Sequence, residues 1–333
     1  MKKEKRQWVV DLGTELTKII SGYRNEAGIV QIENYWIEKT PKDVFNEGMP
    51  EKKIDLVVFL RTLLKGHSRK DDLMLVLNHR KMIVSSFAYP MMTQEDLKKA
   101  VKWEMQVMIP EKLAEWDSAY HEISNATKAK ATEKIDDWRI DYLAKERIER
   151  FEYLGFDDKK IDALGIAVQK ELLDAYCRVF KSTKHALKRI EPQFYGYGKL
   201  LDAEAKRMDL LIDMGQTGAR LMFYDKGFLQ EERRIETRVS SDLDGYLAPI
   251  VKGIMDSFQS PLGIARGYEK SNIYLLGGES IKDGVLASIG AKINKEIKSL
   301  SCFLENQQLF RFPEEITKDE ICLLLPCLSG MLR

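Results

Sequence analysis

The feature of this sequence that most constrains its fold is a short pattern that occurs twice, 202 residues apart. The first copy is Asp11-Leu12-Gly13-Thr14 and the second is Asp213-Met214-Gly215-Gln216-Thr217-Gly218. In each copy an apolar run precedes the aspartate, and a cation, Lys18 or Arg220, follows it by seven positions. Further apolar runs and turn residues continue each copy as a meander of three predicted strands. A repeat at this distance predicts two lobes of related fold rather than a short-period solenoid.

The residues between the two copies follow a different plan. Leu73 to Leu77 and Met82 to Tyr89 are predicted strands on either side of a turn. Thr93 begins a predicted capping box, and apolar residues at helical spacing follow it as far as Met108. Glu146 to Leu154 is predicted to form a second helix. The fold class that we expect is α/β, with lobe I at residues 1–72, an inserted α+β subdomain at 73–164, the return of lobe I at 165–200, a shortened lobe II at 201–317 and a closing helix at 318–333.

Composition excludes several classes of function. The 53 Lys and Arg residues nearly balance the 52 Asp and Glu residues, so overall charge offers no case for nucleic-acid binding. The longest nearly apolar stretch, Ile321 to Leu332, is shorter than the about 20 residues that cross a bilayer. The cysteines have no C-x-x-C spacing and the amino-terminal residues do not fit a secretory signal, so a cytoplasmic, reduced protein is expected. The histidines lack zinc-like spacing and no common catalytic motif occurs, so neither a metal site nor a catalytic residue is predicted.

The repeated loops are the best candidates for a ligand site. Glycine lets the backbone approach a phosphate closely, loop amides and threonine hydroxyls can donate to it, and aspartate can hold a metal-bound water. An ordinary hairpin turn is the alternative for either loop taken alone. Between a predicted strand and a helix, Gly277-Gly278 adds a third loop whose amides favour an anion. The candidate nucleotide-binding residues are Asp11, Gly13, Thr14, Lys18, Asp213, Gly215, Gln216, Thr217, Gly277 and Gly278.

Together with a fourth stretch, these loops resemble a known superfamily. Glu191-Pro192-Gln193-Phe194-Tyr195-Gly196-Tyr197-Gly198 lies just before the second copy. The order Asp-Leu-Gly-Thr, Glu-Pro-x-x-x-Gly-Tyr-Gly, Asp-Met-Gly, Gly-Gly-Glu-Ser and a closing apolar helix resembles the actin-like ATPase superfamily. Within it, the chain is similar to the PilM family of cytoplasmic type IV pilus assembly proteins, which is related to FtsA. The stretches that carry this narrower resemblance are residues 88–111, 153–164 and 325–333.

The resemblance implies a two-lobed actin-like (ribonuclease H-like) fold with a cleft for ATP and Mg²⁺, but the sequence departs from the family on the nucleoside side. Ala219 stands where the second phosphate loop of the family often carries Thr. Only 39 residues separate Arg238 from Gly277. That interval is too short for both a small subdomain of lobe II and the helix that precedes Gly277. We therefore expect a truncated second lobe, weak or no binding of ATP and Mg²⁺, and at most a weak ATPase.

The resemblance also implies a function in assembly rather than catalysis. The expected protein is a cytoplasmic scaffold of a type IV pilus or related secretion platform, held at the inner membrane by the cytoplasmic tail of a single-span PilN-like partner. A pilus ATPase and further copies of this chain are also expected partners. The tail is predicted to dock between the inserted subdomain and lobe I, on a groove lined by Met91, Met92, Met105 and Met108. The alternative for these methionines is a helix core in which Met fills gaps.

Two other classes of function stay open from the sequence. One is an actin-fold, ATP-dependent small-molecule kinase, although no sugar site is marked. The other is an FtsA-like polymerising cytoskeletal protein, for which a C-terminal amphipathic membrane helix is expected. Residues 321–333 lack the charged face of such a helix.

Overall fold

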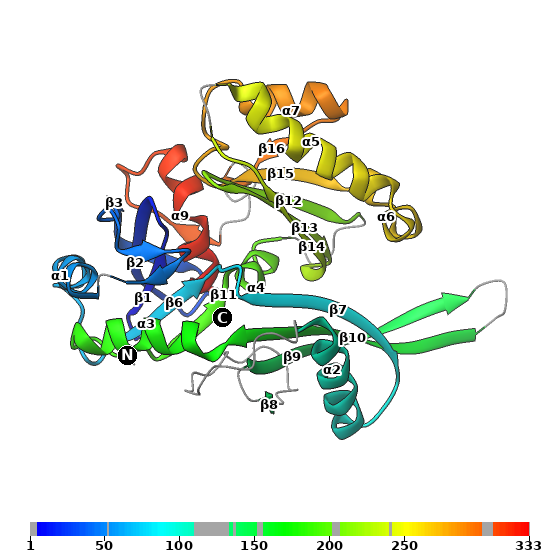
Figure 1. Ribbon diagram of the computed structural model, residues 1–333, viewed down its shortest axis with the longest axis horizontal. Coiled ribbons are helices and arrows are strands. Elements are labelled where there is room, and N and C mark those ends of the chain that lie inside the picture. Colours follow the sequence, from blue (N-terminus) through cyan, green and yellow to red (C-terminus); the bar gives the residue numbers. More distant parts are fainter. Residues whose placement is uncertain are drawn as a thin grey trace. The chain divides into compact units, whose positions relative to one another are not determined.

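The computed structural model of the chain (Figure 1) describes residues 5–51, 53–109, 133–135, 138–151, 156–201, 207–239, 242–301 and 309–332. The chain forms two compact units. The first comprises residues 1–40, 66–77 and 191–332, and the second comprises residues 41–65 and 78–190. This partition differs from the division predicted from sequence, which stays a prediction.

The first copy of the repeat lies in a six-stranded sheet of the order β11-β6-β1-β2-β3-β17. Strands β1, β2 and β3 form the antiparallel meander that the sequence predicts, and β6 runs parallel to β1. Consecutive side chains, Val9 and Val10 on β1 and Ile19 and Ile20 on β2, are fully buried, so both faces of these central strands are covered. The strands are β1 (Gln7–Leu12), β2 (Leu16–Arg24), β3 (Val30–Lys39), β6 (Asp72–Leu77), β11 (Arg189–Pro192) and β17 (Phe310–Arg311).

The second copy repeats this topology in a five-stranded sheet of the order β14-β13-β12-β15-β16. Its first strand, β12, pairs antiparallel with β13 and parallel with β15, as β1 does with β2 and β6. The prediction of two lobes of related fold is confirmed by this shared topology. The strands are β12 (Asp209–Gly215), β13 (Gly218–Asp225), β14 (Phe228–Glu236), β15 (Asn272–Leu276) and β16 (Lys298–Ser299).

Helices cover one face of the second sheet and account for the interval between β14 and β15. The described residues of that interval form α5 (Leu243–Gln259), α6 (Pro261–Arg266) and the short 3-10 helix η2 (Tyr268–Lys270). With α7 (Val285–Ile293), α5 lies on the same side of the sheet (Figure 1). Leu247, Ile250 and Ile254 of α5 share one core with Leu221 and Phe223 of β13. Of these helices, α5 and η2 contribute residues to the core beneath the sheet, and the expected truncation of this lobe stays a prediction.

Two helices connect the sheets of the first unit. The closing helix α9 (Lys318–Met331) begins at a capping box formed by Thr317 and Glu320, and nearly all of its residues are buried. The short helix α4 (Gln193–Gly198) packs so tightly against α9 that a Cβ on Gly196 would lie 2.4 Å from Ser329 Oγ. Because α9 packs in the core, it does not offer a free face to a membrane surface. No helix in the described part of the chain is long and apolar enough to cross a membrane.

The second unit contains a four-stranded sheet of the order β7-β10-β9-β8, with helices packed on it. Thr93 caps α2 by accepting a hydrogen bond from the Asp96 amide, as the sequence predicts, and Leu97 and Val101 bury the inner face of that helix. The elements are β4 (Phe45–Asn46), β5 (Met49–Pro50), α1 (Lys53–Leu63), β7 (Met82–Pro90), α2 (Gln94–Met108), β8 (Glu133–Ile135), β9 (Trp138–Phe151), β10 (Phe156–Gln169) and α3 (Lys170–Ser182).

One secondary-structure prediction in this unit is wrong. The segment predicted as a helix from Glu146 belongs to strand β9, which pairs with β10 as far as Phe151, opposite Phe156. The rest of the predicted helix, residues 152–154, lies outside the described residues. Pairing along a long neighbouring strand outweighs the helix propensity of a charged segment, because strand formation depends on its cross-strand partners.

Candidate functional site

The first loop of the candidate site is built around an ion pair at the end of β1. Asp11 lies opposite Lys18 in the β1–β2 register, and the Lys18 ammonium donates to Asp11 Oδ2 at 2.7 Å. Both side chains are mostly buried, with exposed fractions of 11% for Asp11 and 16% for Lys18. Burial alone would lower the pKa of Lys18, but the charge and hydrogen bond of Asp11 outweigh it and raise that pKa. Lys18 is therefore held as a cation whose charge Asp11 neutralises.

The turn between β1 and β2 holds Gly13 and Thr14. The Gly13 amide donates to the Leu16 carbonyl at 3.1 Å, and the Thr40 hydroxyl donates to the Gly13 carbonyl at 2.8 Å. A Cβ on Gly13 would lie 2.7 Å from the Leu16 carbonyl oxygen, so the tight turn requires glycine. Thr14 is exposed at the tip. The Gly13 amide is used inside the turn, so Gly13 shapes this loop and does not offer that amide to a ligand.

The second loop has an aspartate without such an ion pair. Asp213, at the corresponding place on β12, accepts a hydrogen bond from the Tyr197 hydroxyl at 3.5 Å. Arg220 lies opposite Asp213 in the β12–β13 register, but its guanidinium donates to Glu232 at 3.0 Å and to Gln193 at 3.1 Å. Burial raises the pKa of Asp213 in spite of the nearby charges of Arg220 and Lys18.

The tip of the second loop is open. Gly215, Gln216 and Thr217 are exposed, and a Cβ on Gly215 would meet only the Gly218 carbonyl oxygen, at 3.7 Å. The loop is fixed from behind by Tyr246 on α5, whose hydroxyl donates to the Gly215 carbonyl at 2.7 Å. This loop is held in position and exposed, as an anion-binding turn requires.

The third loop lies directly against the second. Gly277 has a φ of +92°, and a Cβ there would lie 2.6 Å from Asp213 Oδ1 and 2.4 Å from the Met214 carbonyl oxygen. The Glu279 amide donates to that Met214 carbonyl at 3.1 Å. Gly278 faces the closing helix, since a Cβ there would meet Leu323 at 3.6 Å. Only glycine fits at position 277, which agrees with the prediction that this pair belongs to the same site as Asp213.

The charged residues of the first two loops come together around a buried tyrosine, Tyr197, and the third loop joins them where Gly277 lies against Asp213. The charges of both Asp213 and Asp11 act on Tyr197 and, with burial as the larger cause, raise its pKa well above the usual value. Asp213 also acts on Lys18. Sequence reasoning missed Tyr197 as a site residue, although it belongs to the Glu-Pro-x-x-x-Gly-Tyr-Gly motif. It also missed Tyr246 and Glu232, for which no local signal exists.

The arrangement suits a phosphate better than a whole nucleotide. Exposed backbone at Gly215 to Thr217 can accept an anion, but Lys18 is neutralised by Asp11, and Arg220 is engaged by Glu232 and Gln193. In the described part of the interval between β14 and β15, α5 and η2 pack on the sheet, whereas α6 contributes no residue to that core. Among the described residues, no group of three or more His, Cys, Asp or Glu side chains could hold a metal ion. Weak or absent binding of ATP and Mg²⁺ stays a prediction.

The four methionines predicted to line a partner groove do not form one surface. Met105 is fully buried in the core beneath α2, and Met92 is a partly buried side chain packed against that core. Met91 and Met108 are exposed, with fractions of 45% and 43%. Met105 therefore fills the helix core, which corrects its predicted role, because a residue without exposed surface cannot contact a partner. Trp103 and Val107, one turn apart on α2, are more exposed than any of the methionines.

Comparison with known proteins places the fold. No protein-family model matches the sequence, and a search of curated proteins finds no match. Among solved structures, the chain is similar to a chain of a PilM-PilN type IV pilus biogenesis complex, with a TM-score of 0.67, 14% identity, and coverage of 98% of this chain and 96% of that one. It is also similar to a Bacteroides thetaiotaomicron protein of actin-like ATPase fold and unknown function, with a TM-score of 0.51, 7% identity, and coverage of 100% and 97%. The chain therefore has the actin-like ATPase fold, and the predicted resemblance is confirmed at the level of the fold.

Proposed function

We propose that this chain is a scaffold of a type IV pilus or related secretion platform, and that it binds the cytoplasmic tail of a PilN-like membrane protein. The observation that carries the proposal is the similarity in fold, over 98% of the chain, to a chain of a PilM-PilN complex. On this proposal the protein is cytoplasmic and reaches the inner membrane through its partner. A pilus ATPase and further copies of the chain are additional candidate partners.

The state of the cleft supports an assembly function rather than catalysis. Lys18 is paired with Asp11 and Arg220 with Glu232, so the two cations of the repeated loops are engaged by carboxylates. A small-molecule kinase needs a base that takes the proton of the acceptor hydroxyl. Asp213 is the carboxylate that the loops offer for this, and its raised pKa is an effect of burial. A scaffold needs neither unpaired cations nor a catalytic base at this place. Binding of ATP and Mg²⁺ is accordingly proposed to be weak or absent.

The second unit supplies a surface suited to an extended peptide. Strand β7 (Met82–Pro90) is an edge strand of the described sheet, since it pairs with β10 alone. Exposed apolar side chains, Met91, Trp103 and Met108, lie just after this strand and on α2. An added strand gains main-chain hydrogen bonds at such an edge, and neighbouring apolar side chains supply specificity. The tail is therefore proposed to dock along β7 and α2.

A binding measurement with the full chain tests this proposal. The probe is a synthetic peptide of the cytoplasmic tail of a PilN-like single-span protein encoded near this chain's gene, titrated by calorimetry without ATP. We expect one peptide per chain with a dissociation constant of roughly micromolar size, or about 8 kcal/mol of binding free energy. No binding at a peptide concentration about a hundredfold higher would contradict the proposed function.

Charge substitutions then locate the surface. Met91→Glu and Met108→Glu place a carboxylate on exposed positions, so each variant is expected to keep its fold and to weaken peptide binding by about tenfold, or 1.4 kcal/mol. Ile54→Glu on α1 is the matched control, because Ile54 is an exposed apolar residue of the same unit, and it should leave binding unchanged. If both methionine variants bind the peptide as the native chain does, the tail docks elsewhere. Met105→Glu is unsuitable, since it would place a charge in the core.

A further inference from the structure

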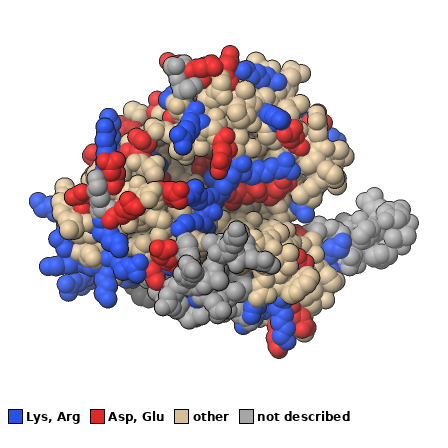
Figure 2. Space-filling view, in the orientation of Figure 1, with Lys and Arg blue, Asp and Glu red and all other residues tan. Residues whose placement is uncertain are grey.

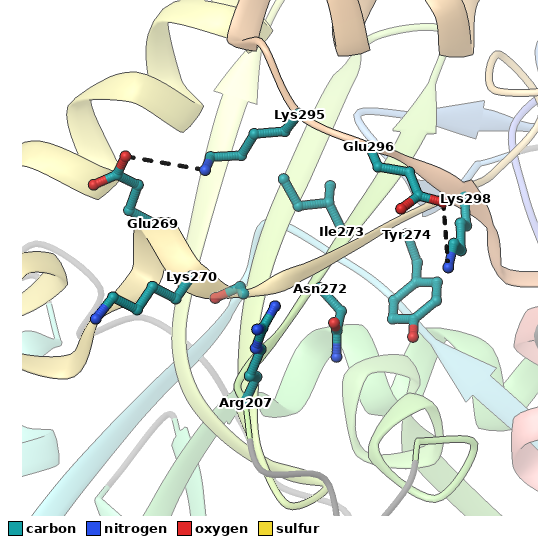
Figure 3. Close-up of a pocket in the computed structure, with 10 residues that line it drawn as sticks. Arg207, Glu269, Lys270, Asn272, Ile273, Tyr274, Lys295, Glu296 and Lys298 are labelled. Carbon is teal, nitrogen blue, oxygen red and sulfur yellow. Dashed lines mark ion pairs between the residues drawn. The ribbon is translucent and has the colours of Figure 1, made fainter.

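A pocket of about 560 Å³ lies at the amino-terminal edge of the lobe II sheet (Figure 3). Its lining comes from Arg207 before β12, from residues 269–274 at the start of β15, and from Lys295, Glu296 and Lys298 around the start of β16. Because β12 and β15 are parallel, Asp213 and Gly277 lie at their carboxyl ends and this pocket at the other. Strand β15 rises about 3.3 Å per residue, so roughly 13 Å separates its two ends. The pocket is thus distinct from the three loops.

Positive charge is concentrated in this pocket. Over much of the face shown in Figure 2, cations and carboxylates are interspersed, as expected for a chain with a net charge of +1. The pocket lining instead contains four cations, Arg207, Lys270, Lys295 and Lys298, and only two carboxylates, Glu269 and Glu296. The carboxylates hold two of the cations loosely, with Nζ–Oε1 distances of 4.0 Å for Lys295–Glu269 and 3.4 Å for Lys298–Glu296. An anion that enters meets an excess of positive charge.

Two features of the lining favour an oxyanion in particular. Arg207 is exposed and makes no ion pair within the described part of the chain, and its guanidinium points toward the middle of the pocket lining (Figure 3). Ser271, only 9% exposed, has a buried hydroxyl with no hydrogen-bond partner among the described residues. A buried hydroxyl without a partner is unfavourable, and rotation about one bond can redirect it. The forked donors of arginine match the geometry of a phosphate.

We propose that this pocket binds a phosphate-bearing small molecule of up to nucleotide size. The volume falls within the range of about 300–1,000 Å³ that is usual for small-molecule sites, and the pocket is concave rather than a flat peptide surface. Ligands of open α/β sheets usually bind at the carboxyl ends of the strands. A site at the amino ends would let the protein respond to a phosphorylated metabolite independently of its cleft and of its tail-binding surface.

Calorimetric titration of the full chain with inorganic pyrophosphate, and separately with AMP, tests this site at low ionic strength. Binding of at least one probe is expected, and it should weaken as salt is added, because exposed charges are screened. Arg207→Glu should weaken binding by about tenfold, and the milder Arg207→Gln, at the same exposed position, by about threefold. Lys252→Glu is the matched control, since Lys252 is an exposed lysine of the same lobe outside the pocket, and it should bind as the native chain does.

Three results would overturn the proposal. The first is no binding of either probe at millimolar concentration. The second is equal affinity of the native chain and both Arg207 variants, which would place the anion elsewhere. The third is loss of binding in Gly215→Val with retention in Arg207→Glu, which would assign the anion to the phosphate loops. Retention in Gly215→Val together with loss in Arg207→Glu supports the pocket.

Discussion

The two copies of the strand–loop–strand repeat have the same backbone pairing but use their charges differently. In both, an aspartate at the end of the first strand lies opposite a cation on the second, as Asp11 does to Lys18 and Asp213 to Arg220. The first pair closes at 2.7 Å. In the second copy, Arg220 forms its ion pair with Glu232 on the neighbouring strand β14 instead, with an Nη2–Oε1 distance of 2.9 Å.

This difference shows what a repeated motif can and cannot specify. Register is a property of the strands, so equal spacing from aspartate to cation places both cations opposite their aspartates. Which partner the cation takes depends on the residues that other elements bring to it. In the first lobe no described hydrogen bond competes with Asp11 for Lys18, whereas the second lobe offers both Glu232 and Gln193 to Arg220. Equal motifs therefore lead to one neutralised aspartate and one half-buried aspartate that makes no ion pair within the described part of the chain.

The largest expected effect comes from removing the cation in each copy. Lys18→Met leaves Asp11 mostly buried without its partner and should lower the free energy of unfolding by about 3 kcal/mol. Arg220→Met should lower the free energy of unfolding less, by about 2 kcal/mol, because Glu232 still accepts a hydrogen bond from Arg234 at 3.1 Å. Urea denaturation at pH 7 measures both. Equal losses would mean that Arg234 does not compensate and that the two ion pairs are equivalent.

The cost of Lys18→Met also depends on pH. The folded-state pKa of Lys18 is raised, so its contribution to stability is complete below the unfolded-state pKa of about 10.4 and is lost as pH rises through the folded-state value. The difference between the native chain and Lys18→Met should therefore stay constant from pH 7 to about 10 and shrink above it.

The equivalent glycines of the two loops provide the next comparison. Gly13→Ala places a Cβ 2.7 Å from the Leu16 carbonyl oxygen, and the backbone shift needed should cost about 2 kcal/mol. Gly215→Ala meets only the Gly218 carbonyl oxygen, at the ordinary distance of 3.7 Å, and should change stability by less than about 0.5 kcal/mol. Each variant serves as the control for the other in the same denaturation experiment. A large loss for Gly215→Ala would show that the second loop is as tight as the first.

These contrasts also mark how much the sequence could predict. The repeat, the three loops and the closing helix rest on local patterns of strand, turn and apolar residues, and all of them are found in the structure. The partners of Arg220 lie 12 and 27 residues away, on β14 and α4, and nothing in the motif indicates them. Met105 was assigned to a surface because helical spacing alone does not tell which apolar residues face the core. The part of strand β9 from Glu146 to Phe151 is predicted as a helix because its pairing with β10 is tertiary and leaves no local signal.

The aspartates themselves should respond in opposite directions to neutralisation. The folded-state pKa of Asp213 is raised by burial, so its ionised form is a cost to the folded state at neutral pH, and this cost disappears as pH falls below the unfolded-state pKa of about 3.9. Asp213→Asn should therefore raise the free energy of unfolding by about 1 kcal/mol at pH 7, and the gain should vanish near pH 4. Asp11→Asn should lower stability at pH 7, because Lys18 loses its counter-charge. If both substitutions lower the free energy of unfolding at pH 7, the different pairing of the two aspartates does not change the sign of their contribution to stability.

The smallest expected effect is that of ATP with Mg²⁺ on thermal stability. A complete site at 100 times its dissociation constant would add about 2.7 kcal/mol, which corresponds to several degrees in melting temperature. Because Lys18 and Arg220 are already paired, we expect the three loops to contribute less than about 1 °C to any shift at millimolar ATP. A larger shift has two possible origins, which two variants separate. If Gly215→Val removes it, the paired cations must exchange their carboxylates for phosphate, and the two loops work together despite their different charges. If Arg207→Glu removes it while Gly215→Val does not, the nucleotide binds at the basic pocket, and the two copies of the repeat take no part in it.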